Sequence, residues 1–286
     1  MRRIGGILLV ASLLAPACNR APAARQFELK GQILSIDTER QEVLVRHEDI
    51  PGFMSAMTMP YKVKDAGLLQ GREAGDLVTA TLVVEEVNAY LSTLTRTGHA
   101  AIENPPPAPL ITASDLLVEG EQVPDHVLVD QDKTPRLMIS LRGHRVALTF
   151  MYTRCPMPEF CPRMDRNFVE VQKIIAQTPE LADVRLVSVT LDPAFDTPAV
   201  LKAHADGLHA DLSRWHFVTG DREELASFAK RFGVTAEPGE PGAMMVHNLR
   251  TAVIDPDGRL VTIHSGNMWT PAELVADLKA APAPAH

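Results

Sequence analysis

Residues 149–164 read TFMYTRCPMPEFCPRM, a stretch in which an apolar run ends at two cysteines, Cys155 and Cys161. The chain holds three cysteines, and the third, Cys18, follows an apolar segment at the N-terminus. The pair in this stretch therefore supplies the thiols of the folded body that can form a disulfide or share a metal ion. The loop that carries them is constrained by three prolines, Pro156, Pro158 and Pro162.

Strand and helix patterns alternate on both sides of this stretch. The run just before the cysteines, 145–152, places Val146, Leu148 and Phe150 on one face of a buried strand. Apolar residues at helical spacing follow, and they predict a helix that begins near Asp165. Further strands are expected at 126–132, 135–143, 185–191, 215–220, 245–255 and 259–265, and further helices from Thr197, Asp221 and Thr270. This order predicts an α/β domain of the thioredoxin-like type over residues 113–282.

The position of the cysteines, between a strand and a helix, predicts reactive thiols. A thiolate at a helix N-terminus lies near the positive end of the helix dipole and near free backbone N–H groups, which lower its pKa below the ordinary value of about 8.5. Such a thiolate is both a nucleophile and a ligand for soft metals. The alternative is an inert disulfide that staples the loop, although closing so short a loop constrains little of the unfolded chain.

A metal held by two thiolates needs a third ligand, which one of the ten histidines can supply. His247 is the best placed, because it precedes a predicted strand in the hairpin region, where thioredoxin-like domains fold a loop over the cysteine helix. Two cysteines and one histidine offer Cu(I) a three-coordinate site, to which Cu(II) can add a weak ligand. Asp192, after the strand 185–191, is expected to orient a site residue or to lie near the metal. The alternative is an ordinary turn or helix-start aspartate.

Short runs of alternating polar and apolar residues between 26 and 98 predict a small all-β domain ahead of the α/β domain. Its length suits a five-stranded barrel like the oligonucleotide/oligosaccharide-binding (OB) fold. A proline-rich segment at 99–112 separates the two domains and is expected to be an extended linker.

A methionine cluster gives the small domain a candidate metal site of its own. Met57 and Met59 point to the same face of a strand, and a hairpin can bring His47 to that face. Thioether and imidazole ligands suit Cu(I) or Ag(I) and are poor ligands for magnesium or calcium. The alternative is that both methionines are core residues and that the histidine lies at the surface.

Residues 1–18 have the pattern of an export signal, with Arg2 and Arg3 ahead of a short apolar segment and small residues before Cys18. The apolar segment is shorter than the roughly 20 residues that span a bilayer as a helix, which favours a removed leader over an uncleaved anchor. Ordinary signal cleavage fits, and so does lipid attachment at Cys18, which is the favoured alternative. The protein is therefore expected outside the cytoplasm, in a bacterial periplasm or on the outer face of a membrane, where dithiols meet an oxidising environment.

Several motifs of the α/β domain resemble the SCO/SenC family of copper chaperones for cytochrome oxidase. The matching pieces, in the order of the family, are TFMYTRCP with a second CP, LVSVTLDPAFDTPAVLKAHA, WHFVTGDREEL with FAKRFGV, and VHNLRTAVIDPDGRLV. The resemblance implies copper ligands at Cys155, Cys161 and His247, and it places the aspartate of the family pattern at Asp192. The chain departs from that pattern in having five residues between the cysteines, where the family usually has three.

The segment HEDIPGFMSAMTMPY, at 47–61, resembles periplasmic copper- and silver-binding proteins of the CusF type. The residues that match their pattern are His47, Ile50, Met57, Thr58 and Met59. The copper-capping tryptophan of these proteins is absent, and Phe53 or Met54 stands near its place. The resemblance implies a copper site in the small domain, capped by one of these two side chains.

The leading hypothesis is an exported copper-binding protein or metallochaperone that delivers copper to the copper centre of cytochrome c oxidase or to another periplasmic copper protein. The linker would let the small domain present its metal to the larger one. The alternative is an enzyme, a thiol–disulfide oxidoreductase in which one cysteine attacks a partner's disulfide and the other resolves it. A peroxidase is disfavoured, because Thr153 stands two residues before Cys155, where a peroxidatic cysteine typically has its threonine three residues before.

The expected partners follow from these features. They are copper ions, a copper-accepting protein such as an oxidase subunit, a thioredoxin-like reductant for the cysteine pair, and a membrane reached through a lipid on Cys18. The net charge of -8, without a long basic run, argues against a nucleic-acid partner.

Overall fold

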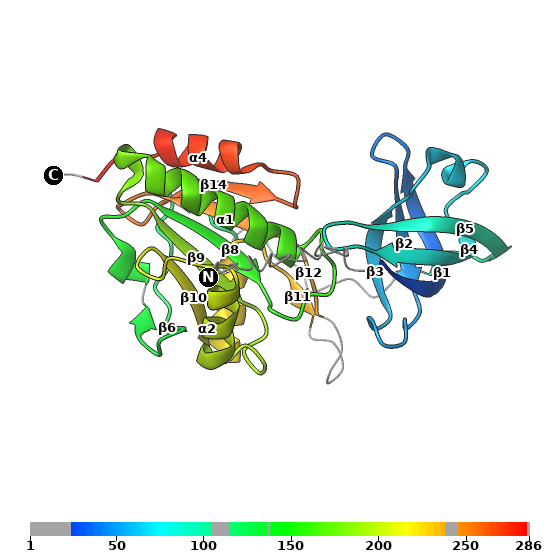
Figure 1. Cartoon of the computed structure of the whole chain (residues 1–286), viewed down its shortest axis with the longest axis horizontal. Helices are drawn as coiled ribbons and strands as arrows, with labels where there is room; N and C mark the ends of the chain where they lie inside the picture. The colour runs from blue at the N-terminus through cyan, green and yellow to red at the C-terminus, as the bar shows by residue number, and fades with distance from the viewer. Residues whose placement is uncertain (1–23, 104–114, 137, 238–244, 285–286) are drawn as a thin grey trace, which may run out of the picture.

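The computed structural model describes residues 24–103, 115–136, 138–237 and 245–284. The predicted leader with Cys18, and most of the predicted linker at 99–112, lie outside these residues. The described chain forms a β-barrel followed by an α/β domain, which Figure 1 shows at the right and the left of the molecule. None of the described helices is both long enough and apolar enough to cross a membrane.

The first part is a five-stranded antiparallel barrel. Its strands are β1 (Arg25–Asp37), β2 (Glu42–His47), β3 (Met57–Lys62), β4 (Asp76–Val84) and β5 (Ala89–His99). They pair in the order β3-β2-β1-β4-β5, and the two edges meet because the N–H of Lys64 donates to the carbonyl of Leu91 at 2.9 Å. This contact closes the sheet. The prediction of a small five-stranded all-β domain is confirmed.

Alternation of side chains along β2 and β3 builds the barrel interior. Val45 and His47 of β2 are buried, as are Met59 and Tyr61 of β3. Strand β1 approaches β2 closely at Gly31, which pairs with His47, and a Cβ on this glycine would lie 2.8 Å from the His47 Cα. The missing side chain at Gly31 therefore leaves room for His47 in the middle of the sheet.

The second part is an α/β domain on a mixed seven-stranded sheet. Its strands are β6 (Leu128–Asp130), β7 (Pro135–Arg136), β8 (Val146–Met151), β9 (Arg185–Thr190), β10 (Trp215–Gly220), β13 (Arg250–Ile254) and β14 (Leu260–Ser265). They pair in the order β14-β13-β8-β9-β10-β6-β7, with β8, β9 and β10 parallel to one another, β13 antiparallel to β8, and β14 antiparallel to β13. A parallel centre with a C-terminal hairpin is the thioredoxin-like plan, so the predicted fold class is confirmed.

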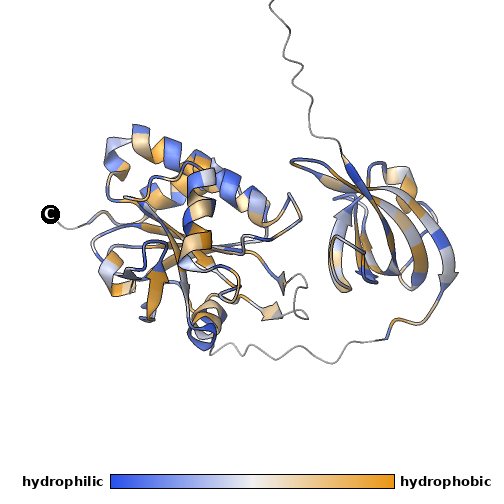
Figure 2. Cartoon of the chain, turned by 60° about the horizontal axis from the view of Figure 1, so that its bottom comes forward, coloured by the Kyte–Doolittle hydropathy of each residue, from blue (hydrophilic) through white to orange (hydrophobic). Residues whose placement is uncertain are grey.

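Helices cover both faces of this sheet. They are α1 (Cys161–Gln177), α2 (Pro198–Gly207), α3 (Arg222–Arg231) and α4 (Pro271–Ala280). Ala147 and Met151 of β8 pack in a core that includes residues of α1, α2 and α4. Val146, Leu148 and Phe150 pack in a second core with α3, as their shared face predicts. Figure 2 shows hydrophobic residues, in orange, in the strands of both parts of the molecule.

Three local predictions differ from the structure. The expected strand at 135–143 is only two residues long in β7, and a 3-10 helix, Met138–Leu141, follows it. Helix α1 begins at Cys161, ahead of the expected start near Asp165, because Pro162 fits the first helical turn and does not belong to the preceding loop. The strand expected at 245–255 is divided into β12 (Val246–His247) and β13, and β12 pairs with β11 (Ala236–Glu237).

Candidate metal centres

The two cysteines of the larger domain lie where β8 passes into α1. Cys155 is half-buried in the loop after β8, whereas Cys161 is the buried first residue of α1, and both are free thiols. Phe160 holds the N-cap position and makes no capping hydrogen bond with its side chain. The first-turn N–H groups of α1 therefore lack a side-chain cap, and the N–H of Cys161 donates to the sulfur of Cys155.

The environment gives the two thiols different acidities. The hydrogen bond from the Cys161 side chain outweighs the effect of burial and lowers the pKa of Cys155 to about 7. Burial, followed by the proximity of Cys155, raises the pKa of Cys161 well above its ordinary value. Near neutral pH the pair therefore carries one thiolate, on Cys155, and one thiol, on Cys161. The predicted lowering of a thiol pKa by the helix N-terminus is wrong for Cys161, which begins α1 but is buried; the pKa is lowered at Cys155, first through the hydrogen bond with Cys161.

The third candidate ligand, His247, comes from a distant part of the chain. Its Nε2 atom lies 3.4 Å from the Sγ atom of Cys161. Its Nδ1 atom is 2.9 Å from the carbonyl oxygen of Asn248, and because a carbonyl only accepts, Nδ1 carries the proton. The lone pair of Nε2 therefore faces the sulfur, and burial keeps the imidazole neutral by lowering its pKa to about 4. A neutral imidazole beside a thiolate and a thiol is a donor set that suits Cu(I).

Asn248 fixes the hairpin that carries His247. Its side-chain oxygen accepts from the N–H of Thr235 at 2.9 Å, and its amide donates to the carbonyl of Gly233 at 2.8 Å. The edge of the Tyr152 ring packs against the imidazole, with ring centroids 5.6 Å apart. Sequence reasoning missed Asn248, although an asparagine between a candidate ligand and a strand is a signal for a side chain that fastens a turn.

Asp192 lies just after β9 and acts on the loop next to the cysteines. It is buried, and its carboxylate pairs with the guanidinium of Arg154 at 2.5 Å. Arg154 in turn stacks over the ring of Phe195 at 4.3 Å. Because Arg154 immediately precedes Cys155, the aspartate is placed to orient the cysteine loop, and its hydrogen bonds go to the guanidinium.

Asp196 is a second aspartate on the same segment, which the sequence analysis did not single out. It is fully buried and accepts hydrogen bonds from the backbone N–H of Thr153 at 3.1 Å, from the hydroxyl of Thr153, and from the hydroxyl of Thr190 at 2.5 Å. Thr153 is two residues before Cys155, so this carboxylate ties the start of the cysteine loop to β9. The signal available in the sequence was Thr190, six positions before this aspartate at the end of a predicted strand.

Replacing Asp196 with alanine is expected to destabilise the larger domain by about 3 kcal/mol, because three donors, one of them fully buried, lose their charged acceptor. It should also weaken copper binding, since the loop that carries Cys155 is no longer held. Urea unfolding followed by tryptophan fluorescence, and Cu(I) titration of the reduced protein, measure the two effects. The exposed Asp206 on α2 supplies the matched control Asp206→Ala. Unfolding curves that coincide for the two variants would contradict the role given to Asp196.

The small domain brings its three predicted residues onto one face. His47 of β2 lies directly opposite Met57 of β3, and Val45 lies opposite Met59. Directly opposed residues share a face of an antiparallel sheet, and so do residues two apart on one strand. The side chains of His47, Met57 and Met59 therefore lie on the same face of the β2–β3 pair. Met57 is half-buried, whereas the other two are buried.

The His47 side chain has one nitrogen available. Its Nδ1 atom donates to the carbonyl of Glu48 at 2.7 Å, which leaves the lone pair on Nε2. That Nε2 atom is buried and has no hydrogen-bond partner within the described part of the chain. Burial also lowers the pKa of His47, so the ring is neutral. A buried, unpartnered imidazole nitrogen beside two thioethers fits a Cu(I) ion.

The two candidate capping residues have different surroundings. Phe53 stacks on Phe27, with ring centroids 4.3 Å apart, and the guanidinium of Arg25 lies 5.6 Å from both rings. Met54 is buried, and its sulfur accepts from the Tyr61 hydroxyl at 3.6 Å. Tyr61 also packs edge-on against His47 at 5.8 Å. Met54 is therefore the candidate that Tyr61 links to the His47 ring.

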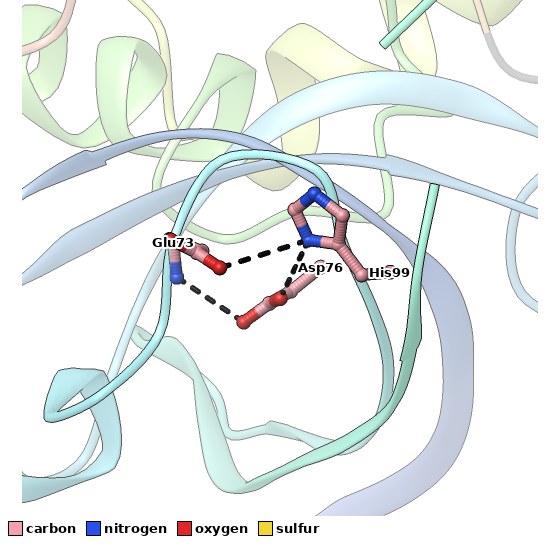
Figure 3. A group of neighbouring side chains, drawn as sticks. All are labelled: Glu73, Asp76 and His99. Atoms are coloured by element: carbon pink, nitrogen blue, oxygen red, sulfur yellow. Dashed lines mark hydrogen bonds and ion pairs between the residues drawn. The ribbon is translucent and has the colours of Figure 1, made fainter. Parts of the chain in front are cut away.

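A third group of titratable side chains, Glu73, Asp76 and His99, lies where β4 begins and β5 ends (Figure 3). The Nδ1 atom of His99 is 3.1 Å from a carboxylate oxygen of Asp76 and 3.9 Å from one of Glu73. Arg96 enters the same group, at 2.8 Å from the Asp76 carboxylate. Arg96 already compensates the charge of both carboxylates. The cluster is therefore an ion-pair network that holds the start of β4 to the end of β5.

Two known families match the two parts of the chain. The family described as SCO1/SenC matches residues 117–282, and the family described as copper binding periplasmic protein CusF matches residues 26–96. Cys155, Cys161 and His247 fall within the first match, and His47, Met57 and Met59 within the second. Cys18 lies outside both.

Individual proteins with similar sequences or structures cover the larger domain. The SCO1 protein homolog of Bacillus subtilis is 29% identical over 155 residues, which are 53% of this chain and 78% of that protein. The structure of a SCO1/SenC family lipoprotein from Bacillus anthracis has a TM-score of 0.51 at 29% identity and covers 56% of this chain and 95% of its own. The structure of BsSco, described as a member of the Sco family of cytochrome c oxidase assembly proteins, has a TM-score of 0.50 at 28% identity and covers 56% and 93%.

Proposed function

The chain belongs to the SCO1/SenC family and carries an N-terminal CusF copper-binding domain, and from this premise we propose that it is an exported copper chaperone with two copper sites. The larger domain holds copper at Cys155, Cys161 and His247. The observation that carries this proposal is the convergence of Cys161 and His247, 86 positions apart in the sequence, to 3.4 Å between sulfur and nitrogen.

The chemistry of the three side chains supports copper as the cargo. Two sulfurs and a neutral imidazole form a soft donor set, which Cu(I) prefers, and Cu(II) accepts the same set with an additional weak ligand. Binding of Cu(I) to a cysteine replaces the S–H bond by a sulfur–copper bond and releases the proton. Cys155 is poised for this step, since its pKa of about 7 leaves it largely deprotonated at slightly alkaline pH.

The small domain is proposed as a second Cu(I) site, made by His47, Met57 and Met59, with Met54 or Phe53 as a cap. Its donors carry no net charge, so the site binds Cu(I) without the proton release that thiols require. The buried Nε2 of His47, without a partner in the described residues, supports this assignment.

Delivery and location complete the proposal. The acceptor is the copper centre of a cytochrome c oxidase subunit or another periplasmic copper protein, which the description of BsSco as a member of an oxidase assembly family supports. The export pattern at 1–18 supports an extracytoplasmic location, with a lipid on Cys18 as the membrane anchor. A thioredoxin-like reductant would keep the cysteine pair reduced, because Cu(I) requires both thiols.

Counting copper tests the proposal. The reduced chain is expected to bind two Cu(I) ions in competition with a colorimetric chelator. Cys155→Ser with Cys161→Ser should retain only the ion of the small domain, and Met57→Leu with Met59→Leu only that of the larger domain. A cysteine double variant that still binds two ions with unchanged affinity would exclude the larger-domain site.

A thiol–disulfide oxidoreductase is the second candidate, and the unequal acidities of the cysteines favour it. The Cys155 thiolate would attack one sulfur of a partner's disulfide and release the other as a thiolate. The sulfur of Cys161 would then attack the mixed disulfide, which frees the reduced partner and leaves a Cys155–Cys161 disulfide. Two electrons pass to the partner in this cycle, and a thioredoxin-like reductant returns them to the cysteine pair.

A further inference from the structure

The two candidate copper sites open onto the same cavity. Between the barrel and the α/β domain lies a cavity of about 120 Å³. From the barrel it is lined by Met57 and Met59, and from the larger domain by Cys155 and His247. The remaining sides include Tyr152, Phe160 and Met245. Met57 and Met59 of the barrel site therefore share one open cavity with Cys155 and His247 of the larger-domain site.

The segment between the two cysteines packs on the barrel beside this cavity. Met157, in its centre, is only 2% exposed and belongs to the hydrophobic core of the barrel, together with Met54 and Met59. Cys155 and Phe160 pack against the same core. The side chain of Met157 thus leaves its own domain and fills a place in the neighbouring one.

An ion pair flanks this apolar contact. The ammonium of Lys62, at the end of β3, lies 3.7 Å from the carboxylate of Glu159, which also belongs to the segment between the cysteines. In Figure 1 β12, which carries His247, lies on the side of the α/β domain nearest to β3. An apolar side chain and a charged one from the same short segment therefore both bind the barrel.

We propose that residues 156–160 are an intramolecular docking element, which seats the barrel on the cysteine site so that Cu(I) passes directly between Met57 or Met59 and Cys155. The inference rests on the proposed function, in that both sites must hold Cu(I). It adds that the barrel is the copper partner of the cysteine site within the same chain, and that Met157 holds the two together.

The transfer is a ligand exchange without a change of oxidation state. Copper remains Cu(I) throughout, while its bonds to thioether sulfur and to His47 break and bonds to Cys155, Cys161 and His247 form. Both cysteine sulfurs bind copper as thiolates, and any proton that they still carry is released to solvent. The cysteines must be reduced, so an oxidised pair would leave copper on the barrel.

Reduction of the cysteine pair tests the inference on the full chain. Loaded with one equivalent of Cu(I) while Cys155 and Cys161 are held as a disulfide, the protein should carry copper on the thioethers of the barrel. After rapid mixing with an excess of a phosphine reductant and of a Cu(I) chelator, the thiolate-to-copper absorption in the ultraviolet should grow at a rate independent of protein concentration. Capture of the copper by the chelator before that absorption grows would overturn direct transfer.

Variants at Met157 separate docking from copper binding. Met157→Asp places an unpaired carboxylate in the barrel core and should lower the transfer rate by at least about 100-fold. Met157→Leu keeps an apolar side chain of similar volume and should keep the rate within about threefold. Met268 is 62% exposed, so Met268→Asp is the matched control and should transfer like the unmodified chain. A Met157→Asp rate equal to that of this control would overturn the docking role.

The ion pair offers a second, milder variant. Lys62→Glu should slow transfer about threefold, as expected for a pair in which only Lys62 is exposed, and Lys62→Glu with Glu159→Lys should restore it. Equilibrium titration of each variant shows separately whether both sites still bind Cu(I). If both sites bind Cu(I) but the transfer rate depends on protein concentration, the docking element alone is refuted. If the unmodified chain fails to bind Cu(I) at one of the two sites, the proposed function is refuted.

Discussion

Replacing His247 with alanine is expected to weaken Cu(I) binding at the cysteine site by at least about 100-fold. Losing a residue that only supports a metal ligand weakens binding by up to about 100-fold, and losing a ligand itself should weaken it at least as much. The reason is geometric and electronic. The Nε2 lone pair lies 3.4 Å from the Cys161 sulfur, and the neutral ring fills the space that the metal's third donor needs. Chelator competition on the reduced protein, with the barrel site removed by Met57→Leu and Met59→Leu, measures this affinity directly.

The same variant distinguishes the two candidate functions. A thiol–disulfide oxidoreductase needs the Cys155 thiolate, whose lowered pKa comes first from the hydrogen bond with Cys161, so exchange with a small disulfide should proceed nearly unchanged in His247→Ala. His264, on the edge strand β14, provides the control, because it is also half-buried. Its Nε2 atom lies 2.7 Å from the carboxylate of Asp277 on α4. His264→Ala should leave both copper affinity and exchange rate intact. Unchanged copper affinity in His247→Ala would remove this histidine from the site.

Lowering the pH from about 8 to about 6 is expected to weaken Cu(I) binding at the cysteine site roughly 1000-fold, because each proton that copper displaces costs a factor of ten per pH unit. Above the Cys155 pKa of about 7, only Cys161 must lose a proton, since its pKa is raised by burial. Below it, both thiols are protonated and two protons are displaced. The logarithm of the affinity should therefore rise with pH at a slope near two below pH 7 and near one above it.

His247 does not contribute to this slope, because its pKa is lowered to about 4 and the ring is neutral throughout the range. The barrel site supplies an internal comparison. Thioethers do not titrate, and burial lowers the pKa of His47 below its ordinary value, so its affinity should change by less than about tenfold over the same two pH units. Cu(I) titrations of the Cys155→Ser, Cys161→Ser double variant measure the barrel site alone. Equal pH dependence at the two sites would contradict the assignment of thiolates to one and thioethers to the other.

Much of the architecture was predictable because it depends on local spacing. The face shared by Val146, Leu148 and Phe150 follows from the period of a strand, whatever packs against it. Helix starts at Thr197 and Thr270 followed from capping residues, whose side chains bond to N–H groups three positions along the chain. The common face of Met57 and Met59 has the same origin, and the hairpin register that places His47 opposite Met57 needs only the pairing of adjacent strands.

Local spacing failed where two local signals competed. Prolines on both sides of Cys161 predicted a loop through Pro162, but proline is also favoured in the first turn of a helix, and α1 begins at Cys161. The apolar run at 135–143 resembled a strand, yet after β7 it turns into a short helix that buries Met138 and Leu141. In both segments the tertiary packing of the apolar residues selected between conformations that the local sequence allows.

The sequence by itself determined the two-part plan, the strand and helix faces, and the residue types that can bind copper, since these depend on periodicity and on side-chain chemistry. Only the tertiary structure decided which of them meet. It brings His247 to Cys161, makes Asp196 the anchor of the cysteine loop, and inserts Met157 into the core of the barrel. The physical reason is that such contacts join segments far apart in the chain, where the free energy depends on how whole elements pack and not on the spacing of neighbouring residues.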